Sequence, residues 1–468
     1  MAAAKRTLIR GGTVVSARTA MAADLLMEGE KIAGQGDLAG VRADEEIDAN
    51  GLLVLPGAVD SHVHFNDVFM NTVSVHDYYT GTLAAAYGGV TSVIDFSNQG
   101  QGESLLDTID TKEREAQGRA LVDWGVHPVI TRPDDGTLRQ IPRAVERGAP
   151  TIKCYLTYRS EGLMIEEEDL KRILQALDRA GGMLMVHAED NDLIESGVAA
   201  MVDSGRLTSI YHARSRPAEA ENRAIDRCIQ VVREVGGRLF IVHLASAGGI
   251  DLVRAARQEG LAVFAETCTH YLLFTEEMLE RPDGLKWICS PPLRSWANRE
   301  RPWAGLKENV ISMVTSDDAA YSWEAKLYGK ERFDLCPNGI PGVEPRLNLL
   351  YSEGVTTGRL TLPRWVELCS TAPARFFGLY PAKGSLEPGA DADIVLFDPA
   401  AEWLMNRDSL HMAADWSAYE NISVKGKITK VFSRGEPIID GARCLAEAGR
   451  GRYLHRVLNG GEQGTNHG

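Results

Sequence analysis

Short apolar runs alternate with longer helical segments from residue 57 to about residue 380, and this alternation constrains the fold more than any other feature. The runs have the length of buried strands. Segments such as 170–180 and 221–235 place apolar residues at three- and four-residue steps, as amphipathic helices do. Eight strands with helices between them predict an α/β fold, a (β/α)₈ TIM-like barrel. We expect the strands at 57–63, 90–96, 122–130, 151–157, 182–188, 238–244, 261–266 and 310–316.

The two ends of the chain have a different pattern. Residues 7–55 and 385–440 alternate short β-like pieces with glycine turns, and neither stretch has enough apolar residues to form a domain alone. Together they predict one small β-sandwich domain beside the barrel. The expected limits are 1–56 with 385–457 for the sandwich, 57–384 for the barrel and 458–468 for a flexible tail.

Metal-binding residue types stand where the predicted strands end. His62 and His64 are two positions apart, so on a strand they share a face at a spacing of about 6.5 Å. In a (β/α)₈ barrel the carboxyl ends of the strands meet at one face, where active sites lie. The further candidates at strand ends are Lys153, His187, His243, Asp317 and Asp318.

A lysine in this set requires a separate explanation, because an ammonium group is not a metal ligand. Lys153 fits if its amine is deprotonated and carries CO₂ as a carbamate, whose two oxygens can bridge two cations. Burial near positive charge lowers a lysine pKa as this chemistry requires.

Composition excludes several classes of partner. The net charge of −15 argues against nucleic acid or an anionic membrane, since both favour basic surfaces. No apolar run reaches the ~18 residues of a membrane span, and the N-terminus lacks the apolar core of a signal peptide. The seven cysteines are odd in number and widely spaced, which favours reduced thiols and a cytoplasmic location.

Taken as a set, the motifs resemble those of the cyclic amidohydrolases of the dihydropyrimidinase and hydantoinase family, over residues 7–457. The matching motifs are Pro56-Gly57 to His64, Met70-Asn71-Thr72 to Tyr79 with Gly81, Lys153 to Tyr158, His187-Ala188-Glu189, His243 to Ser246, Glu266-Thr267-Cys268 with Tyr271-Leu272, Ser290 to Arg294, Ser316-Asp317, and Pro337-Asn338-Gly339 with Gly342-Val343-Glu344.

The resemblance implies a dinuclear zinc hydrolase that opens a cyclic amide, in 5,6-dihydropyrimidines or 5-substituted hydantoins, by attack of a metal-bridging hydroxide. It implies that Asp317 is also the general acid and base and that Tyr158 stabilises the oxyanion. Ser290 and Asn338 would contact the substrate through main-chain groups. The implied zinc ligands are His62, His64 and Asp317 for one ion, His187 and His243 for the second, and carboxylated Lys153 as the bridge.

Two positions depart from the family pattern. After Ser316-Asp317 the relatives usually show His, Asn or Gln, whereas this chain has Asp318, either an acceptor for a histidine N–H or a substrate-selecting acid. Phe96 stands where relatives tend to have a polar residue. Together with Phe65, Phe69 and Leu163 it is expected either to line an apolar pocket for a ring substituent or to pack in the core or a lid.

Alternatives remain at this level. An allantoinase-like or cyclic-imide hydrolase differs from the favoured activity only in loops. A metal-free interaction protein on the same scaffold is opposed by the presence of all six ligands. The family also implies a homo-oligomer, a tetramer or dimer.

Overall fold

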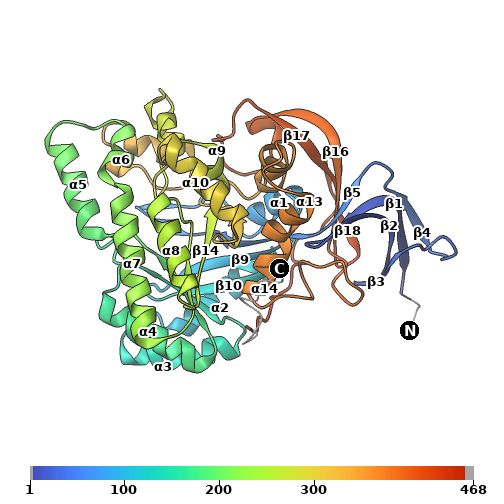
Figure 1. The fold of residues 1–468 in the computed structure, drawn as a ribbon, viewed down its shortest axis with the longest axis horizontal. Helices are drawn as coiled ribbons and strands as arrows, with labels where there is room; N and C mark the ends of the chain where they lie inside the picture. The colour runs from blue at the N-terminus through green and yellow to red at the C-terminus, as the bar shows by residue number, and fades with distance from the viewer. Residues whose placement is uncertain (1–3, 459–468) are drawn as a thin grey trace.

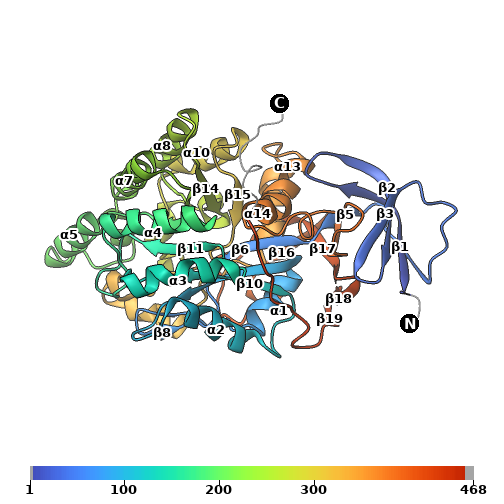
Figure 2. The same ribbon diagram turned by 90° about the horizontal axis from the view of Figure 1, so that it is seen from below.

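The eight predicted strands are the eight parallel strands of a barrel in the computed structural model, which describes residues 4–458 (Figures 1 and 2). Hydrogen bonding follows chain order. The prediction of a (β/α)₈ barrel is therefore confirmed. The strands are β6 (Ala58–Val63), β9 (Val90–Asn98), β10 (Asp123–Val129), β11 (Thr151–Tyr155), β12 (Met183–His187), β13 (Leu239–Ile241), β14 (Val263–Cys268) and β15 (Met313–Thr315).

The barrel closes between β6 and the residues that follow β15. The main chain of Asp318 accepts a hydrogen bond from His64 N at 2.9 Å and donates one to His62 O at 3.2 Å. Behind this contact, the buried Arg346 guanidinium donates to main-chain oxygens of both strands and lies 3.3 Å from the Asp60 carboxylate. The first and last strands are thus held at a fixed register.

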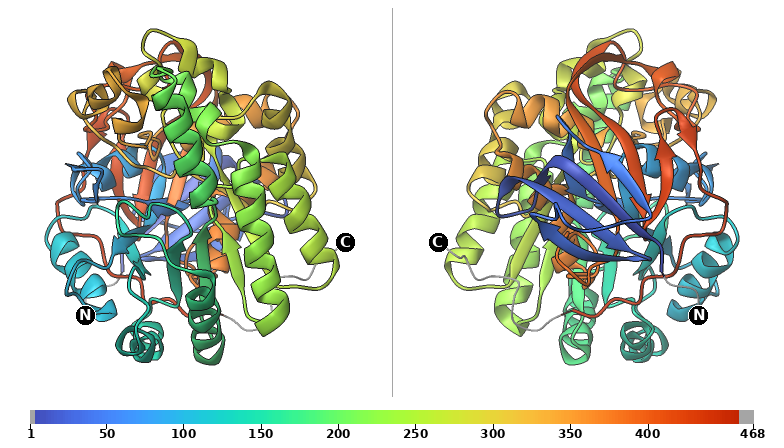
Figure 3. Two further views of the ribbon diagram at one scale, coloured as in Figure 1. Left: turned by 90° about the vertical axis from the view of Figure 1, so that its left-hand side faces the viewer. Right: turned by 90° about the vertical axis from the view of Figure 1, so that its right-hand side faces the viewer.

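Amphipathic helices cover the outside of the barrel (Figure 3). In α4 (Glu167–Ala180), Leu170, Ile173, Leu174 and Leu177 share the buried face. The other helices are α1 (Thr80–Tyr87), α2 (Leu105–Ala116), α3 (Asp135–Glu146), α5 (Asn191–Asp203), α6 (Ile210–Ser215), α7 (Ala218–Val235), α8 (Ala247–Gln258), α9 (Thr269–Leu273), α10 (Trp296–Lys307), α11 (Trp323–Lys326), α12 (Arg346–Leu350), α13 (Leu362–Val366) and α14 (Ala372–Phe376). None of the helices among residues 4–458 combines the length and apolarity that crossing a membrane requires.

Both chain ends build a second, mostly antiparallel sheet beside the barrel, as predicted (Figure 3). Hydrogen bonds link all nine strands into one sheet, and the contact between β5 and β16 joins the N-terminal strands to the C-terminal ones. The strands are β1 (Arg6–Val15), β2 (Ala20–Glu28), β3 (Lys31–Gly36), β4 (Glu45–Asp48), β5 (Leu53–Pro56), β16 (Ile394–Met405), β17 (Ile422–Ser433), β18 (Glu436–Asp440) and β19 (Arg443–Cys444).

The segment after β19 leaves this sheet and runs along the barrel. Leu454 N donates to Trp124 O in β10 at 2.7 Å, and the buried Arg456 donates to Thr151 Oγ1 in β11 at 2.9 Å. The last part of the expected sandwich segment, residues 385–457, therefore packs on the barrel. Of the expected tail, residues 459–468 lie outside the described residues.

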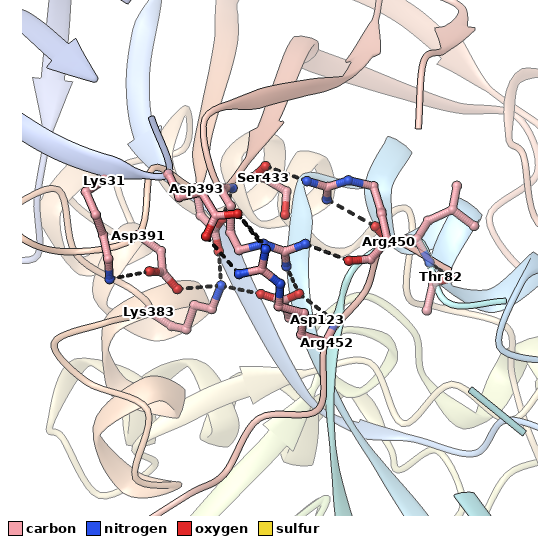
Figure 4. Close-up of polar contacts among 12 residues, drawn as sticks. Lys31, Thr82, Asp123, Lys383, Asp391, Asp393, Ser433, Arg450 and Arg452 are labelled. Atoms are coloured by element: carbon pink, nitrogen blue, oxygen red, sulfur yellow. Dashed lines mark hydrogen bonds and ion pairs between the residues drawn. The ribbon is translucent and has the colours of Figure 1, made fainter. Parts of the chain in front are cut away.

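A buried charge cluster fastens the sheet to the barrel (Figure 4). The Lys383 ammonium contacts Asp123 Oδ2 at 2.6 Å, Asp393 Oδ2 at 2.8 Å and Asp391 Oδ2 at 2.9 Å. Asp123 begins the barrel strand β10 and also binds the Arg434 guanidinium, which follows β17. The three carboxylates lie close enough to hold a cation, and Lys383 supplies that cation itself.

We expect Lys383→Met to lower the free energy of unfolding by about 3–5 kcal/mol, because it leaves buried carboxylates without their counter-ion. The measurement is urea unfolding followed by fluorescence. Lys31→Met is the matched control, since Lys31 binds the same Asp391 at 2.6 Å but from a side chain 54% exposed; an exposed pair contributes about 0–1 kcal/mol. Equal losses in the two variants would show that the buried cluster has no special role.

Candidate metal centre and active site

The predicted ligands converge at the carboxyl face of the barrel. His62 Nε2 lies 2.9 Å and His64 Nε2 lies 3.5 Å from the same oxygen of Asp317, Oδ1. The ring of His243 lies 5.5 Å from the ring of His62 and 4.4 Å from that of His187, measured between centroids. Four strand ends have thus brought two histidine pairs and Asp317 to one place, because parallel strands share a carboxyl face.

Acidic side chains behind the histidines orient their rings. Glu266 contacts Nδ1 of His62, and Asp67 Oδ2 lies 3.3 Å from Nδ1 of His64, so that both rings present Nε2 to the interior. Glu189 Oε2 lies 2.9 Å from Nε2 of His187. Metal-binding histidines typically have such carboxylate partners.

The sequence prediction assigned no orienting role to these three acids. Glu189 and Glu266 stood inside the quoted motifs, and Asp67 follows His64 by three residues. Proximity in sequence was a signal for Glu189 and Asp67. No such signal existed for Glu266, because it comes from β14, far along the chain from His62.

Lys153 lies at the centre of this arrangement and is fully buried. Its Nζ is 4.4 Å from the ring centre of Phe96 and 4.8 Å from that of Tyr155. Burial lowers the pKa of Lys153 to about 8, which favours the neutral amine far more than in water. Among residues 4–458, neither Lys153 Nζ nor His243 Nδ1 has a hydrogen-bond partner. Buried polar atoms rarely stay unpaired, so this donor set fits a bound metal group.

The carboxyl group of Asp317, which lies next to His62 and His64, is ionised. Burial by itself would raise the carboxyl pKa, but the neighbouring His62 and His64 outweigh it and hold the pKa of Asp317 well below its usual range. The group is therefore an ionised carboxylate, able to bind a cation or accept a proton.

Tyr158, Ser290 and Asn338 line the same cavity as the candidate ligands, and the ring of Tyr158 lies 5.4 Å from that of His187 between centroids. The Asn338 amide donates to Tyr158 Oη at 3.3 Å and to Ser290 Oγ at 3.1 Å. Burial raises the pKa of Tyr158 to about 12, so the phenol keeps its proton near neutral pH and can donate it in a hydrogen bond. The cavity thus combines cation-binding groups with neutral polar groups.

Three of these residues adopt backbone conformations that non-glycine residues rarely take. The φ angles are 64° for Tyr158, 40° for His243 and 49° for Asp317. Such residues cost about 1–3 kcal/mol each and persist where surrounding contacts hold them, often at functional sites. These backbone conformations determine the direction in which the three side chains leave the main chain.

The aromatic residues expected to form a substituent pocket lie in different places. Phe69 lines the cavity. Phe65 does not, because its ring is buried against His76 and Tyr78. Phe96 lies beneath the site, where it stacks on His64 with ring centres 5.1 Å apart. Phe96 therefore packs under the candidate ligand His64 and does not line the cavity.

Comparisons with known proteins agree with this geometry. Residues 53–438 match the model of the amidohydrolase family. The chain is 37% identical over 457 residues to a D-hydantoinase of Geobacillus stearothermophilus, covering 97% of both chains. It is 40% identical over 455 residues to a D-phenylhydantoinase of Escherichia coli O1:K1, covering 96% of this chain and 98% of the relative. The crystal structure of a dihydropyrimidinase from Brevibacillus agri NCHU1002 superposes with a TM-score of 0.94 at 36% identity, over 96% of this chain and 98% of that one.

We expect Glu266→Ala to weaken metal binding by about 10–100-fold, because His62 loses the acceptor that orients its ring. Titration with a zinc indicator measures the affinity. Glu266→Gln is the control, since its amide oxygen can still accept from Nδ1. Unchanged affinity in the alanine variant would assign Glu266 a purely structural role.

Proposed function

We propose that this chain, which belongs to the amidohydrolase family and is a cyclic amidohydrolase of the hydantoinase and dihydropyrimidinase type, opens its substrate with a zinc-activated water. The substrate class we propose is 5,6-dihydropyrimidines or 5-substituted hydantoins. The observation that carries the proposal is the cavity that His64, Lys153, His187, His243 and Asp317 line together with Tyr158, Ser290 and Asn338.

The six candidate ligands fit two zinc ions. His62, His64 and Asp317 would hold one ion and His187 with His243 the second. Lys153, carboxylated on Nζ, would bridge them; this assignment is supported by its buried, unpaired amine and its lowered pKa. The chemistry supplied by two bound zinc ions is a water whose pKa falls from 15.7 to about 7.

Asp317 is the proposed acid and base. Its ionised carboxylate takes the proton released as the water oxygen bonds to the ring carbonyl carbon. The same carboxyl group then gives the proton to the ring nitrogen as the C–N bond breaks, so one group serves both steps.

Tyr158 is the proposed oxyanion donor. Its protonated phenol would donate to the carbonyl oxygen, where negative charge develops during attack. Ser290 and Asn338 line the same cavity and would hold the ring amide through main-chain groups. Their hydrogen bond keeps the two residues in one arrangement before the substrate arrives.

The location and assembly belong to the same proposal. All seven cysteines lie in the described part of the chain and are free thiols, which supports a cytoplasmic location. A homo-oligomer, tetramer or dimer, stays a prediction from the family.

We expect purified protein to contain about two zinc ions per chain, as in other hydrolases with paired metal sites, and to open dihydrouracil or a 5-substituted hydantoin. Elemental analysis and a ring-opening assay measure the two properties. Allantoin and succinimide are assayed as further substrates. A clear preference for either would favour the allantoinase-like or cyclic-imide hydrolase over the proposed activity. A metal-free protein without activity on any of them would support the interaction-protein alternative.

Lys153→Ala is the companion variant. It should lose most of the metal and the activity together, because it removes the bridge between the two histidine pairs. Full metal content and activity in Lys153→Ala would contradict the carbamate assignment, whereas partial rescue by a short carboxylic acid would support it.

We expect Tyr158→Phe to lower kcat by about 10²–10³ with a much smaller change in KM, because the lost hydroxyl meets charge that exists only after attack begins. The ring remains, so its edge-to-face contact with Phe69 at 4.9 Å should survive. Steady-state kinetics on the preferred substrate measure the effect. A raised KM at normal kcat would instead make Tyr158 an ordinary binding residue.

A further inference from the structure

Asp318 follows the catalytic aspartate but does not face the cavity. Its side chain is fully buried and points away from the candidate ligands into the protein. Oδ2 lies 2.6 Å from Nδ1 of His76, which is also fully buried. Oδ1 accepts from the main-chain N–H groups of Gly342 at 2.7 Å and Val343 at 3.1 Å. An ionised aspartate only accepts hydrogen bonds, and here every contact comes from a donor.

The hydrogen bonds determine which nitrogen of His76 carries the proton. Nε2 of His76 lies 3.1 Å from the main-chain N–H of Ala413, so Nε2 must accept. Nδ1 must then carry the hydrogen that it donates to Asp318. Hydrogen bonds are therefore donated in one direction, from Ala413 to His76 and from His76 to Asp318. If one of these groups changed from donor to acceptor, or the reverse, two donors or two acceptors would face each other.

The backbone of Asp318 joins two segments that line the active site. It is hydrogen-bonded to His62 and His64, the candidate ligands at the end of β6. It also pairs with Ile340, two residues after Asn338, which lines the cavity. The side chain adds Gly342 and Val343 from the same loop. A single residue therefore sets the position of the metal-binding strand end relative to the loop that faces the substrate.

We propose that Asp318 and His76 form a buried pair whose hydrogen-bond polarity positions the metal ligands of β6 and the Asn338 loop for ring opening. Both are positioning residues, since neither touches the cavity. The inference rests on the proposed function and deepens it by adding two residues to that site. It also answers the question left by the sequence, because Asp318 acts as a histidine acceptor and not as a substrate-selecting acid.

Substitutions of similar shape test the polarity of the pair. In Asp318→Asn the amide oxygen can still accept from Gly342 and Val343, but the amide N–H group then meets the N–H of His76. His76→Asp places a carboxylate oxygen where Nδ1 stood, facing the carboxylate of Asp318. In the double variant His76→Asp with Asp318→Asn, the new amide donates to the new carboxylate. His76→Asn keeps a donor at the Nδ1 position, so the bond to Asp318 keeps its direction. Both His76 variants lose the Nε2 acceptor of the Ala413 N–H, so they differ from each other only in the polarity toward Asp318.

We expect Asp318→Asn and His76→Asp each to lower kcat/KM by about 10²-fold, the cost of misplacing reacting groups by about 1 Å. The double variant should recover most of this loss, and His76→Asn should stay close to wild type. Kinetics on the preferred substrate, zinc content and thermal unfolding are measured for every variant. His411→Asn is the matched control, a partly exposed histidine on the Ala413 segment that pairs with Glu344 at 2.8 Å.

Each outcome bears on the inference. The positioning role is supported if the double variant recovers activity and if kcat/KM across the variants depends on hydrogen-bond polarity and not on melting temperature. Single variants that melt earlier but turn over normally per folded, zinc-loaded chain would overturn it and leave the pair a purely structural role. A double variant no better than either single variant would also overturn it. If the wild-type protein binds zinc but opens none of the cyclic amides, the proposed function fails, and the zinc content and affinity of the variants still report on positioning.

Discussion

The closure of the barrel between its first and last strands is the constraint on which the active site depends. His62 lies at the end of the first strand and His64 directly after it, while Asp317 stands more than 250 residues later, two residues after the last strand. Their side chains reach one point only because the main chain of Asp318 pairs with the end of β6. Each pair of neighbouring strands contributes to this closure, because the register offsets between neighbours add up around the barrel and fix how the first and last strands meet.

Several buried charges that support the architecture are paired with an opposite charge. Asp60 faces Arg346 at 3.3 Å behind the barrel closure, Asp95 faces Lys112 at 3.0 Å, and Lys383 faces three carboxylates. A buried ion without a partner is costly, so such pairs are what a stable interior requires. Lys326 and Lys153 are buried without a carboxylate partner. The ammonium of Lys326 donates to three main-chain oxygens instead, whereas Lys153 Nζ lies over aromatic rings, has no hydrogen-bond partner among residues 4–458, and has a pKa lowered to about 8. The missing hydrogen-bond partner separates Lys153 from the lysines that support the architecture.

Much of the architecture could be predicted, and the choices that the sequence left open have physical reasons. The eight strands and the two-ended sheet followed from apolar runs and glycine turns, which are local properties of the chain. Phe65 and Phe96 were expected either to line a substituent pocket or to pack in the core or a lid, and in the structure Phe65 packs against Gly81 and Phe96 beneath His64. A phenylalanine at a strand end is equally suited to a cavity wall or a core. Only its neighbours decide between the two.

The sequence by itself determined the barrel, the order of its strands and the residue types at their carboxyl ends, because hydrophobic periodicity and strand direction are written along the chain. Tertiary structure alone decided how those residues work. Glu266 reaches His62 from another strand, the direction of the hydrogen bonds through His76 and Asp318 is set by Ala413 and Gly342, and the positive φ angles of Tyr158, His243 and Asp317 are held by packing. These are contacts between residues distant in sequence, and no local pattern encodes a distance or a hydrogen-bond direction between them.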